Sequence, residues 1–225
     1  VDATSDRTAD VAFDDDGFVS ASSKIYNPSA GGSDGDTLAA FVSTDNEVYV
    51  HTWYDQSGEG SNATDLAGSP DAANQPKIYT GNNLVTDVVT SGTPRAALLF
   101  DGADRFTISN SGLSLDAASV FTTFHITSAG NQVAFTLSYQ YPSPIYYFPY
   151  LVGTVMNWYH DAASATSQDF DDGYGTLTIQ RRLFSFLAGA GSQKMVINGT
   201  TNTAGSPSYS SSNLAGPATR ITIGN

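Results

Sequence analysis

Residues 53–64 read Trp-Tyr-Asp-Gln-Ser-Gly-Glu-Gly-Ser-Asn-Ala-Thr, where an extended apolar run stops abruptly in a glycine loop. The short side chains of Asp55 and Ser57 are able to bond to nearby backbone amides. Gly58 and Gly60 accept left-handed backbone conformations. We therefore predict a strand that ends in a compact loop with a structural role. The residues of this structural loop motif are Trp53, Tyr54, Asp55, Gln56, Ser57 and Gly58.

Short runs rich in Val, Ile, Thr, Tyr and Phe recur along the chain, separated by turn residues among its 21 Gly and 9 Pro. Such residues favour strands, and several runs alternate as a strand in a sheet does. We expect strands over residues 9–13, 47–54, 75–79, 95–100, 104–109, 118–127, 132–139, 145–152, 154–160, 174–187, 193–198 and 219–223. This pattern predicts an all-β fold, an antiparallel β-sandwich of jelly-roll type.

Two local signals refine this prediction. The stretch 36–42 favours one short helix with Asp36 as its N-cap. Asn198-Gly199 predicts a tight hairpin turn. We see no second domain, only a loop-rich N-terminal third, and therefore expect one domain over residues 1–225, cut from a longer polypeptide.

The chain is strongly acidic, with 22 acidic and 9 basic residues and a net charge of −13. Such a surface repels phosphate backbones, so nucleic acid is not expected as a partner. The absence of cysteine excludes disulfides and a cysteine nucleophile. No run approaches the roughly 18 apolar residues of a membrane span, so we expect no membrane insertion.

The stretch at 53–64 resembles the Trp-Tyr-Asp-Gln-Ser-Gly-Asn-Gly-Asn-Asp-Ala-Thr motif of concanavalin A-like (laminin-G-like) jelly-roll domains, which occur in phage virion proteins and secreted carbohydrate-active proteins. Three neighbouring segments, 4–13, 73–78 and 97–104, are also similar to that family. The resemblance covers residues 1 to about 105 and implies a concanavalin A-like sandwich. Glu59 and Ser61 replace the usual asparagines.

No catalytic constellation is visible. Glycosidases use two carboxylates about 5–10 Å apart, yet the only glutamates, Glu47 and Glu59, do not lie in an alternating acidic pattern. His51, His125 and His160 lack zinc-site spacing. We predict no catalytic residues, and a pair of aspartates that converge in space stays an alternative.

Calcium is the one cofactor that the sequence favours. Clustered aspartates on turns supply the oxygen ligands that calcium prefers. The candidate metal residues are Asp169, Asp171 and Asp172, and the run 14–16 is a second acidic turn. The alternative is a solvated acidic turn in both places.

The most aromatic stretch of the chain, residues 139–150, is followed by Trp158. Exposed rings stack on sugars or line subunit interfaces, whereas alternate residues of a strand belong to the core. The candidate carbohydrate-binding or interface residues are Tyr141, Tyr146, Tyr147, Tyr150 and Trp158. Trp53 is expected in the core.

These features predict a non-enzymatic structural, decoration or adhesion module of a virion, such as a capsid decoration, head fibre or tail component. We expect it on a virion surface or outside the cell. Its expected partners are other virion or surface-assembly proteins, further copies of itself and host glycans. A secreted glycoside hydrolase or carbohydrate-binding domain is the alternative, and a bacterial adhesin domain is a third.

Overall fold

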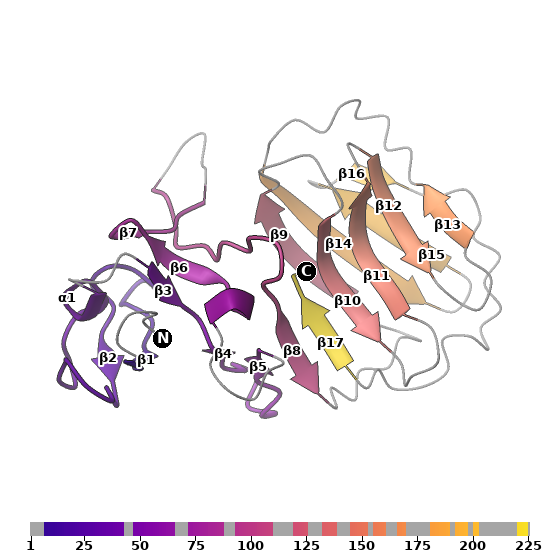
Figure 1. The fold of residues 1–225 in the computed structure, drawn as a ribbon. Helices are drawn as coiled ribbons and strands as arrows, with labels where there is room; N and C mark the ends of the chain where they lie inside the picture. The colour runs from indigo at the N-terminus through magenta and orange to yellow at the C-terminus, as the bar shows by residue number, and fades with distance from the viewer. Residues whose placement is uncertain are drawn as a thin grey trace. The chain divides into compact units, whose positions relative to one another are not determined.

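A computed structural model gives the fold (Figure 1). It describes residues 7–42, 47–65, 72–87, 93–109, 119–125, 132–138, 145–152, 155–160, 166–169, 181–189, 192–197, 200–202 and 220–224. This part of the chain is predominantly antiparallel β-structure, with one five-residue α-helix and one short 3-10 helix. The prediction of an all-β class is confirmed at this level.

The contacts within the chain form two compact units. The N-terminal unit contains Val1–Trp53 and Thr64–Phe106, and the C-terminal unit contains Tyr54–Ala63 and Thr107–Asn225. The prediction of one domain over residues 1–225 stays a prediction, because parts of one domain can also form separate contact clusters. Among the described residues, no helix is long and apolar enough to cross a membrane.

The N-terminal unit is built from short elements. They are β1 (Asp10–Val11), β2 (Ile25–Tyr26), α1 (Leu38–Val42), β3 (Glu47–Tyr49), β4 (Thr52–Trp53), η1 (Ala72–Asn74), β6 (Lys77–Thr80) and β7 (Asn83–Leu84). β1 pairs with β2, and β3, β6 and β7 form a three-stranded sheet. The chain passes from one unit into the other at three places, which are the end of β4 after Trp53 and points within two further strands, β5 (Ala63–Thr64) and β8 (Phe106–Ser109).

A small apolar core holds the N-terminal unit together. Its buried members come from β2, α1, β3 and β6 and are Ile25, Leu38, Phe41, Val42, Val48 and Tyr79. Helix α1 is predicted correctly, but its N-cap is Thr37 rather than Asp36. The Thr37 hydroxyl accepts the N–H of Ala40 at 3.2 Å, whereas the Asp36 carboxylate accepts the N–H of Ser33 in the preceding turn.

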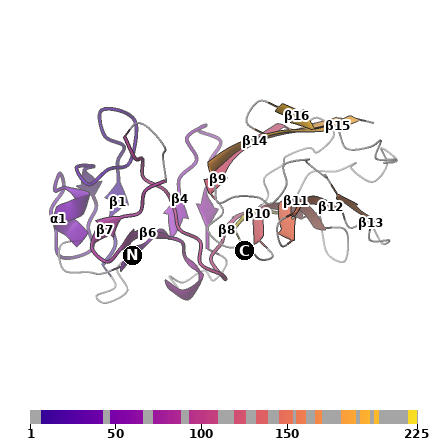
Figure 2. The ribbon, with the colours of Figure 1, turned by 90° about the horizontal axis from the view of Figure 1, so that it is seen from above.

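The C-terminal unit contains the longer strands. They are β9 (Ser119–His125), β10 (Gln132–Ser138), β11 (Ile145–Val152), β12 (Val155–His160), β13 (Thr166–Asp169), β14 (Arg181–Gly189), β15 (Ser192–Ile197), β16 (Thr200–Asn202) and β17 (Arg220–Ile223). One sheet has the order β13-β12-β11-β10-β17-β8, and the other has the order β16-β15-β14-β9. Figure 2 shows the strands β14, β15 and β16 as a layer separate from β10–β13.

Most of the strands expected in this unit are confirmed. Ile197 of β15 pairs with Thr200 of β16, whereas the predicted turn residues Asn198 and Gly199 lie outside the described residues. In the N-terminal unit, residues 95–100 are predicted as a strand, but they make isolated bridges at Ala96 and Leu99 instead. Five short strands were missed, namely β2, β5, β7, β13 and β16, because runs of two to four residues carry little periodicity.

Candidate functional site

The carboxylate of Asp55 is the centre of the loop formed by residues 54–63. Its Oδ1 accepts the backbone N–H of Ser57 at 2.8 Å. Its Oδ2 accepts the Ser57 hydroxyl at 2.8 Å and the N–H of Ser61 at 3.1 Å. The N–H of Asp55 in turn donates to Oδ1 of Asn62 at 2.9 Å. The bonds from Ser57 and Ser61 lower the pKa of Asp55, so this carboxylate serves the loop as an ionised acceptor.

The two glycines of this loop have backbone angles that other residues rarely adopt. Gly58 has φ of 86° and Gly60 has φ of 74°. A Cβ at either position would meet no neighbour within 4 Å, so the backbone angle alone requires glycine. Both oxygens of Asp55 accept hydrogen bonds from backbone and hydroxyl groups of the loop. The structural role of the loop stays a prediction.

The expectation that Trp53 lies in the core is wrong, since this residue is 50% exposed. Its ring meets the fully buried ring of Phe106 edge-on, with centroids 6.3 Å apart and planes at 81°. An edge contact covers only part of an indole ring. Trp53 therefore lies at the margin of the packed residues.

A group of charged residues in the N-terminal unit, here called the Lys77 cluster, joins segments distant in sequence. Its members are Glu47, Tyr49, Lys77, Asp101 and Asp104. Lys77 Nζ lies 2.8 Å from Asp101 Oδ2 and 3.3 Å from Glu47 Oε1. The Tyr49 hydroxyl donates to Glu47, and Lys77 Nζ lies 5.7 Å from the centroid of the Tyr49 ring. The cluster thus fastens β3 and β6 to the turn at residue 101.

The two aspartates of the Lys77 cluster have opposite electrostatic surroundings. The hydrogen bond from Lys77 lowers the pKa of Asp101. Burial raises the pKa of Asp104 to about 6, because this carboxyl group is only 1% exposed. A pair with separated pKa values is also the pattern of catalytic acids and bases. Here, however, Asp104 Oδ2 accepts the N–H of Asp101 at 2.8 Å, so it closes a turn and is inaccessible to a substrate.

A second buried polar pair lies in the same unit. Gln75 is fully buried, and its Nε2 donates to Asp65 Oδ2 at 2.6 Å. His51 Nε2 lies 4.0 Å from the other oxygen of Asp65. Neither this pair nor the Lys77 cluster follows from the sequence alone, although Gln75 and Lys77 both lie in segment 73–78, which resembles concanavalin A-like domains. Only the pairing of segments far apart in the chain brings their partners together.

The candidate calcium residues are largely outside the described part of the chain. Asp169 ends β13, opposite Asn157 of β12, whereas Asp171 and Asp172 lie outside the described residues. In the other acidic turn, Asp14 Oδ1 accepts the N–H groups of Asp16 and Phe18 at 3.1 and 3.0 Å. Within the described ranges, no three acidic or histidine side chains gather as metal ligands. Calcium at Asp169 stays a prediction.

The register of the paired strands shows which of the candidate aromatic residues share a face of the sheet. One row of paired residues crosses five strands and consists of Thr222, Thr136, Tyr147, Tyr159 and Ser167. Every member of this row, here called the hydroxyl row, carries a hydroxyl group. The neighbouring row consists of Ile221, Leu137, Tyr146, His160 and Thr166. Since successive residues of a strand occupy opposite faces, the two rows lie on opposite faces of the sheet.

The predicted aromatic residues are therefore divided between faces. Tyr147 lies on the face of the hydroxyl row, and Tyr146 lies on the face of Leu137 and Ile221. A register shift between Tyr147 and Tyr150 interrupts the pairing with β12. Trp158 pairs with Gln168. Tyr141 lies outside the described residues.

Comparison with known proteins gives little further support for a family. No family model and no curated protein matches this chain. Among solved structures, the chain is similar to a conserved carbohydrate esterase from the Shiga toxin-encoding bacteriophage phi24B, with 12% identity and a TM-score of 0.34. This match covers 79% of the present chain and 90% of that chain.

Proposed function

We propose that this protein is a non-enzymatic, glycan-binding module of concanavalin A-like β-sandwich fold. In this proposal it serves as a structural, decoration or adhesion component on a virion surface, assembled with further copies of itself or with other surface proteins. The hydroxyl row is the observation that carries the glycan-binding part. The virion part is supported by the resemblance of residues 53–64 and their neighbouring segments to domains of phage virion proteins.

The hydroxyl row suits a carbohydrate ligand. Hydroxyl groups both donate and accept hydrogen bonds, as the hydroxyls of a sugar do. Tyr147 and Tyr159 are direct neighbours in the row, on adjacent strands, and their amphipathic rings combine a face for stacking with a polar tip. Five strands at about 4.8 Å spacing give the row a length of about 19 Å. We infer a glycan chain of several units that runs across the strands.

The opposite face supports the sandwich. It carries Ile221 and Leu137 in one row and Ile223, Phe135 and Phe148 in another. One face of the second sheet carries the paired residues Val120, Phe186, Met195, Phe184 and Ile197. Its other face is mixed, because Phe121, Leu183 and Val196 alternate there with polar residues. In the proposed sandwich the apolar faces of the two sheets pack against one another. The hydroxyl row is then expected on the outer face.

Four of the described carboxylates have structural roles that support binding over catalysis in this proposal. Asp55 uses both oxygens within its own loop. Asp101 and Glu47 are paired with Lys77, and Asp104 is buried. A glycosidase needs two carboxylates that face the same substrate, and these four are instead engaged in holding the fold.

Glycan-array binding of purified variants tests the binding face. Tyr147→Ala and Tyr159→Ala should abolish binding, and Tyr147→Phe should weaken it. Tyr146→Phe removes the same hydroxyl group from the next residue, on the other face, and should leave binding unchanged. Equal losses in Tyr147→Phe and Tyr146→Phe would overturn the assignment of the face, and hydrolysis of a bound glycan would overturn the non-enzymatic role.

Sedimentation of the native source material tests the assembly part. The chain, followed by mass spectrometry, should travel with a particle of megadalton mass and remain there through washing. Recovery solely as a free species would overturn the virion role and leave the glycan-binding face as a separate question.

A further inference from the structure

Strand β9 forms one edge of a four-stranded sheet in the C-terminal unit, whose order is β16-β15-β14-β9. Among the described strands it pairs with β14 alone, and the pairing runs over all seven residues of β9 without a register shift. At about 3.3 Å per residue, this regular edge is about 23 Å long. An edge strand presents a row of backbone N–H and C=O groups that can pair with a further strand.

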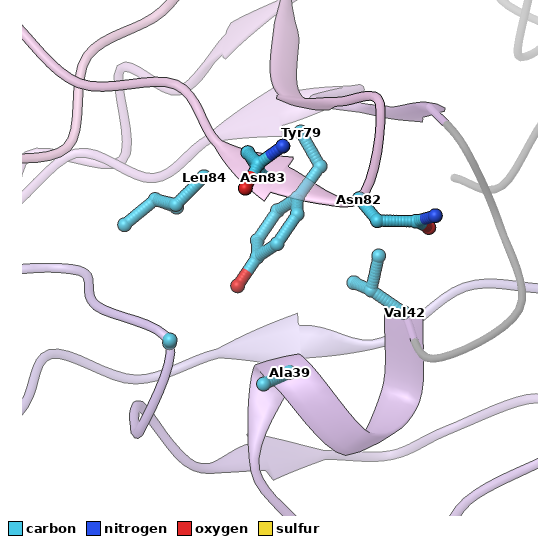
Figure 3. A pocket seen from close by; sticks show the side chains of 7 residues that line it. Ala39, Val42, Tyr79, Asn82, Asn83 and Leu84 are labelled. Carbon is cyan, nitrogen blue, oxygen red and sulfur yellow. The ribbon is translucent and has the colours of Figure 1, made fainter.

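The other sheet edges in the described part of the chain have features that discourage such pairing, which are shortness, charge and irregularity. β13 has four residues and ends in Asp169, and β16 has three residues. β3 has three residues, begins with Glu47 and has a register shift in its pairing with β6. The two-residue strand β7 lies in a hairpin that faces Ala39 and Val42 of helix α1 across a small pocket (Figure 3). β1, β2 and β4 have two residues each.

β9 has none of these protective features. Its sequence is Ser119-Val120-Phe121-Thr122-Thr123-Phe124-His125, which contains no acidic residue, lysine, arginine or proline. Val, Phe and Thr are residues that favour strands. In a chain of net charge −13, such an edge is a place where two copies can approach with little electrostatic repulsion.

The sequence of β9 is also complementary to itself in antiparallel pairing. A two-fold axis at Thr122 lets all seven residues pair, so that Thr122 opposes Thr122, Phe121 opposes Thr123, Val120 opposes Phe124 and Ser119 opposes His125. Pairs of threonines and pairs of an aromatic with a β-branched residue stabilise antiparallel strands. Directly opposed residues lie on the same face of a sheet, so the face that carries Val120 and Phe186 continues from one copy into the other. Any other register that keeps the faces aligned leaves residues of β9 unpaired.

We propose that β9 is the interface between two copies of this chain, which pair their β9 strands antiparallel about a two-fold axis at Thr122. The two four-stranded sheets then form one continuous sheet across the interface. Such an interface uses the same surface on both copies and closes after two of them. This inference rests on the proposed function, because it assigns a surface to the assembly of the protein with further copies of itself. β9 shares no residue with the hydroxyl row, so glycan binding can be measured independently of dimerisation.

Sedimentation velocity of the purified full chain over a wide range of concentrations tests this proposal. The wild type should change from monomer to dimer as its concentration rises. The double variant Phe121→Lys/Thr123→Lys places like charges directly opposite each other in the proposed register and should stay monomeric. Phe121→Glu/Thr123→Glu should stay monomeric for the same reason. An equimolar mixture of the two double variants should form a heterodimer, because each lysine then opposes a glutamate, and this recovery also shows that both variants fold.

The matched control is Thr201→Lys on β16, at the opposite edge of the same sheet. Thr201 lies in one row with Phe121, through Ser185 and Val196, and therefore on the same face. This variant should dimerise as the wild type does.

A wild type that stays monomeric at every concentration would overturn the proposal, and so would a mixture of folded double variants that gives no heterodimer. Loss of the double-lysine variant from the native particle, combined with a monomeric wild type, would assign the β9 edge to a different protein and overturn the pairing of two copies. Dimers that bind no glycan would overturn the proposed glycan-binding face and support this interface, whereas glycan-binding monomers would overturn the interface alone.

Discussion

The ammonium group of Lys77 lies 2.8 Å from the carboxylate of Asp101, and this ion pair joins β6 to a turn 24 residues later in the chain. The same ammonium lies 3.3 Å from Glu47 on β3. One side chain thus connects three segments that are distant from one another in the sequence. Two of them, around Lys77 and Asp101, belong to the segments that resemble concanavalin A-like domains.

Removal of the Lys77 charge should lower stability moderately. Asp101 and Glu47 are 49% and 39% exposed in their side chains, so water screens their interaction with Lys77. We expect Lys77→Met to reduce the free energy of unfolding by about 1 kcal/mol, measured by urea denaturation. Lys24→Met, at an exposed lysine, is the matched control. The difference between the two variants should shrink at 1 M salt, and a difference independent of salt would argue against the ion pairs as its cause.

Asp104 should make stability fall as the pH rises. Its folded pKa of about 6 lies above the ordinary value of 3.8, so the folded state holds a proton that the unfolded state has already lost. The stability linked to this proton is fully present below pH 3.8 and is lost as the pH rises through about 6. By linkage the loss amounts to about 3 kcal/mol at most.

Asp104→Asn isolates this effect, because asparagine keeps an acceptor for the Asp101 amide. Relative to wild type, the variant should gain stability between pH 4 and pH 6 and keep that gain above pH 7. Urea denaturation at several pH values gives the comparison. The matched control is Asp15→Asn, which removes the same charge at an exposed site. A wild-type-to-variant difference that is constant over this pH range would contradict the raised pKa.

Asp55→Asn should loosen the loop of residues 54–63 more than it changes the rest of the fold. The asparagine side chain has only one oxygen. The loop therefore loses either the bond from the Ser57 N–H or the bonds from the Ser57 hydroxyl and the Ser61 N–H. We expect faster cleavage within the loop by a protease of broad specificity, with the sites read by mass spectrometry. Glu59→Gln removes a negative charge from the same loop, at an exposed position, and should be cut at the wild-type rate. Equal cleavage of both variants would contradict the view that the Asp55 carboxylate holds this loop together.

Phe106 and Trp53 should differ sharply in their contribution to stability. Phe106 is fully buried between Trp53 and Phe100, with ring centroids 6.3 and 6.1 Å away. Phe106→Ala should therefore cost about 3–5 kcal/mol. Trp53 is half exposed, and Trp53→Ala should cost roughly 1–2 kcal/mol, in line with its partial burial. Denaturation curves that give the same loss in free energy of unfolding for both variants would indicate that Trp53 belongs to the core.

Local chemistry allowed part of this structure to be predicted from sequence. The Asp55 loop follows from short side chains and glycines within ten residues of each other. The long strands β9–β12 follow from alternation sustained over six or more residues. The hairpin at Gly81-Asn82 was missed although Gly-Asn between two short runs is itself a turn signal.

Other features depend on relations that no local pattern contains. Thr37 and Asp36 are both good N-caps, and the choice between them follows from the turn that recruits Asp36. The Lys77 cluster depends on the pairing of β3 with β6. Alternation alone separates Tyr146 from Tyr147, but the register shift before Tyr150 is set by the partner strand β12.

The place of β17 in its sheet has a consequence for synthesis. This strand, residues 220–223, lies between β10 and β8, both of which precede it by more than 80 residues. A ribosome makes β10 to β13 first. The edge of β10 that later pairs with β17 therefore stays unpaired while β14, β15 and β16 are translated. Such an edge is a template for pairing with a neighbouring nascent chain. Slow translation of residues 139–219 would prolong that interval, and chaperones that cover strand edges would be needed most while these residues are made.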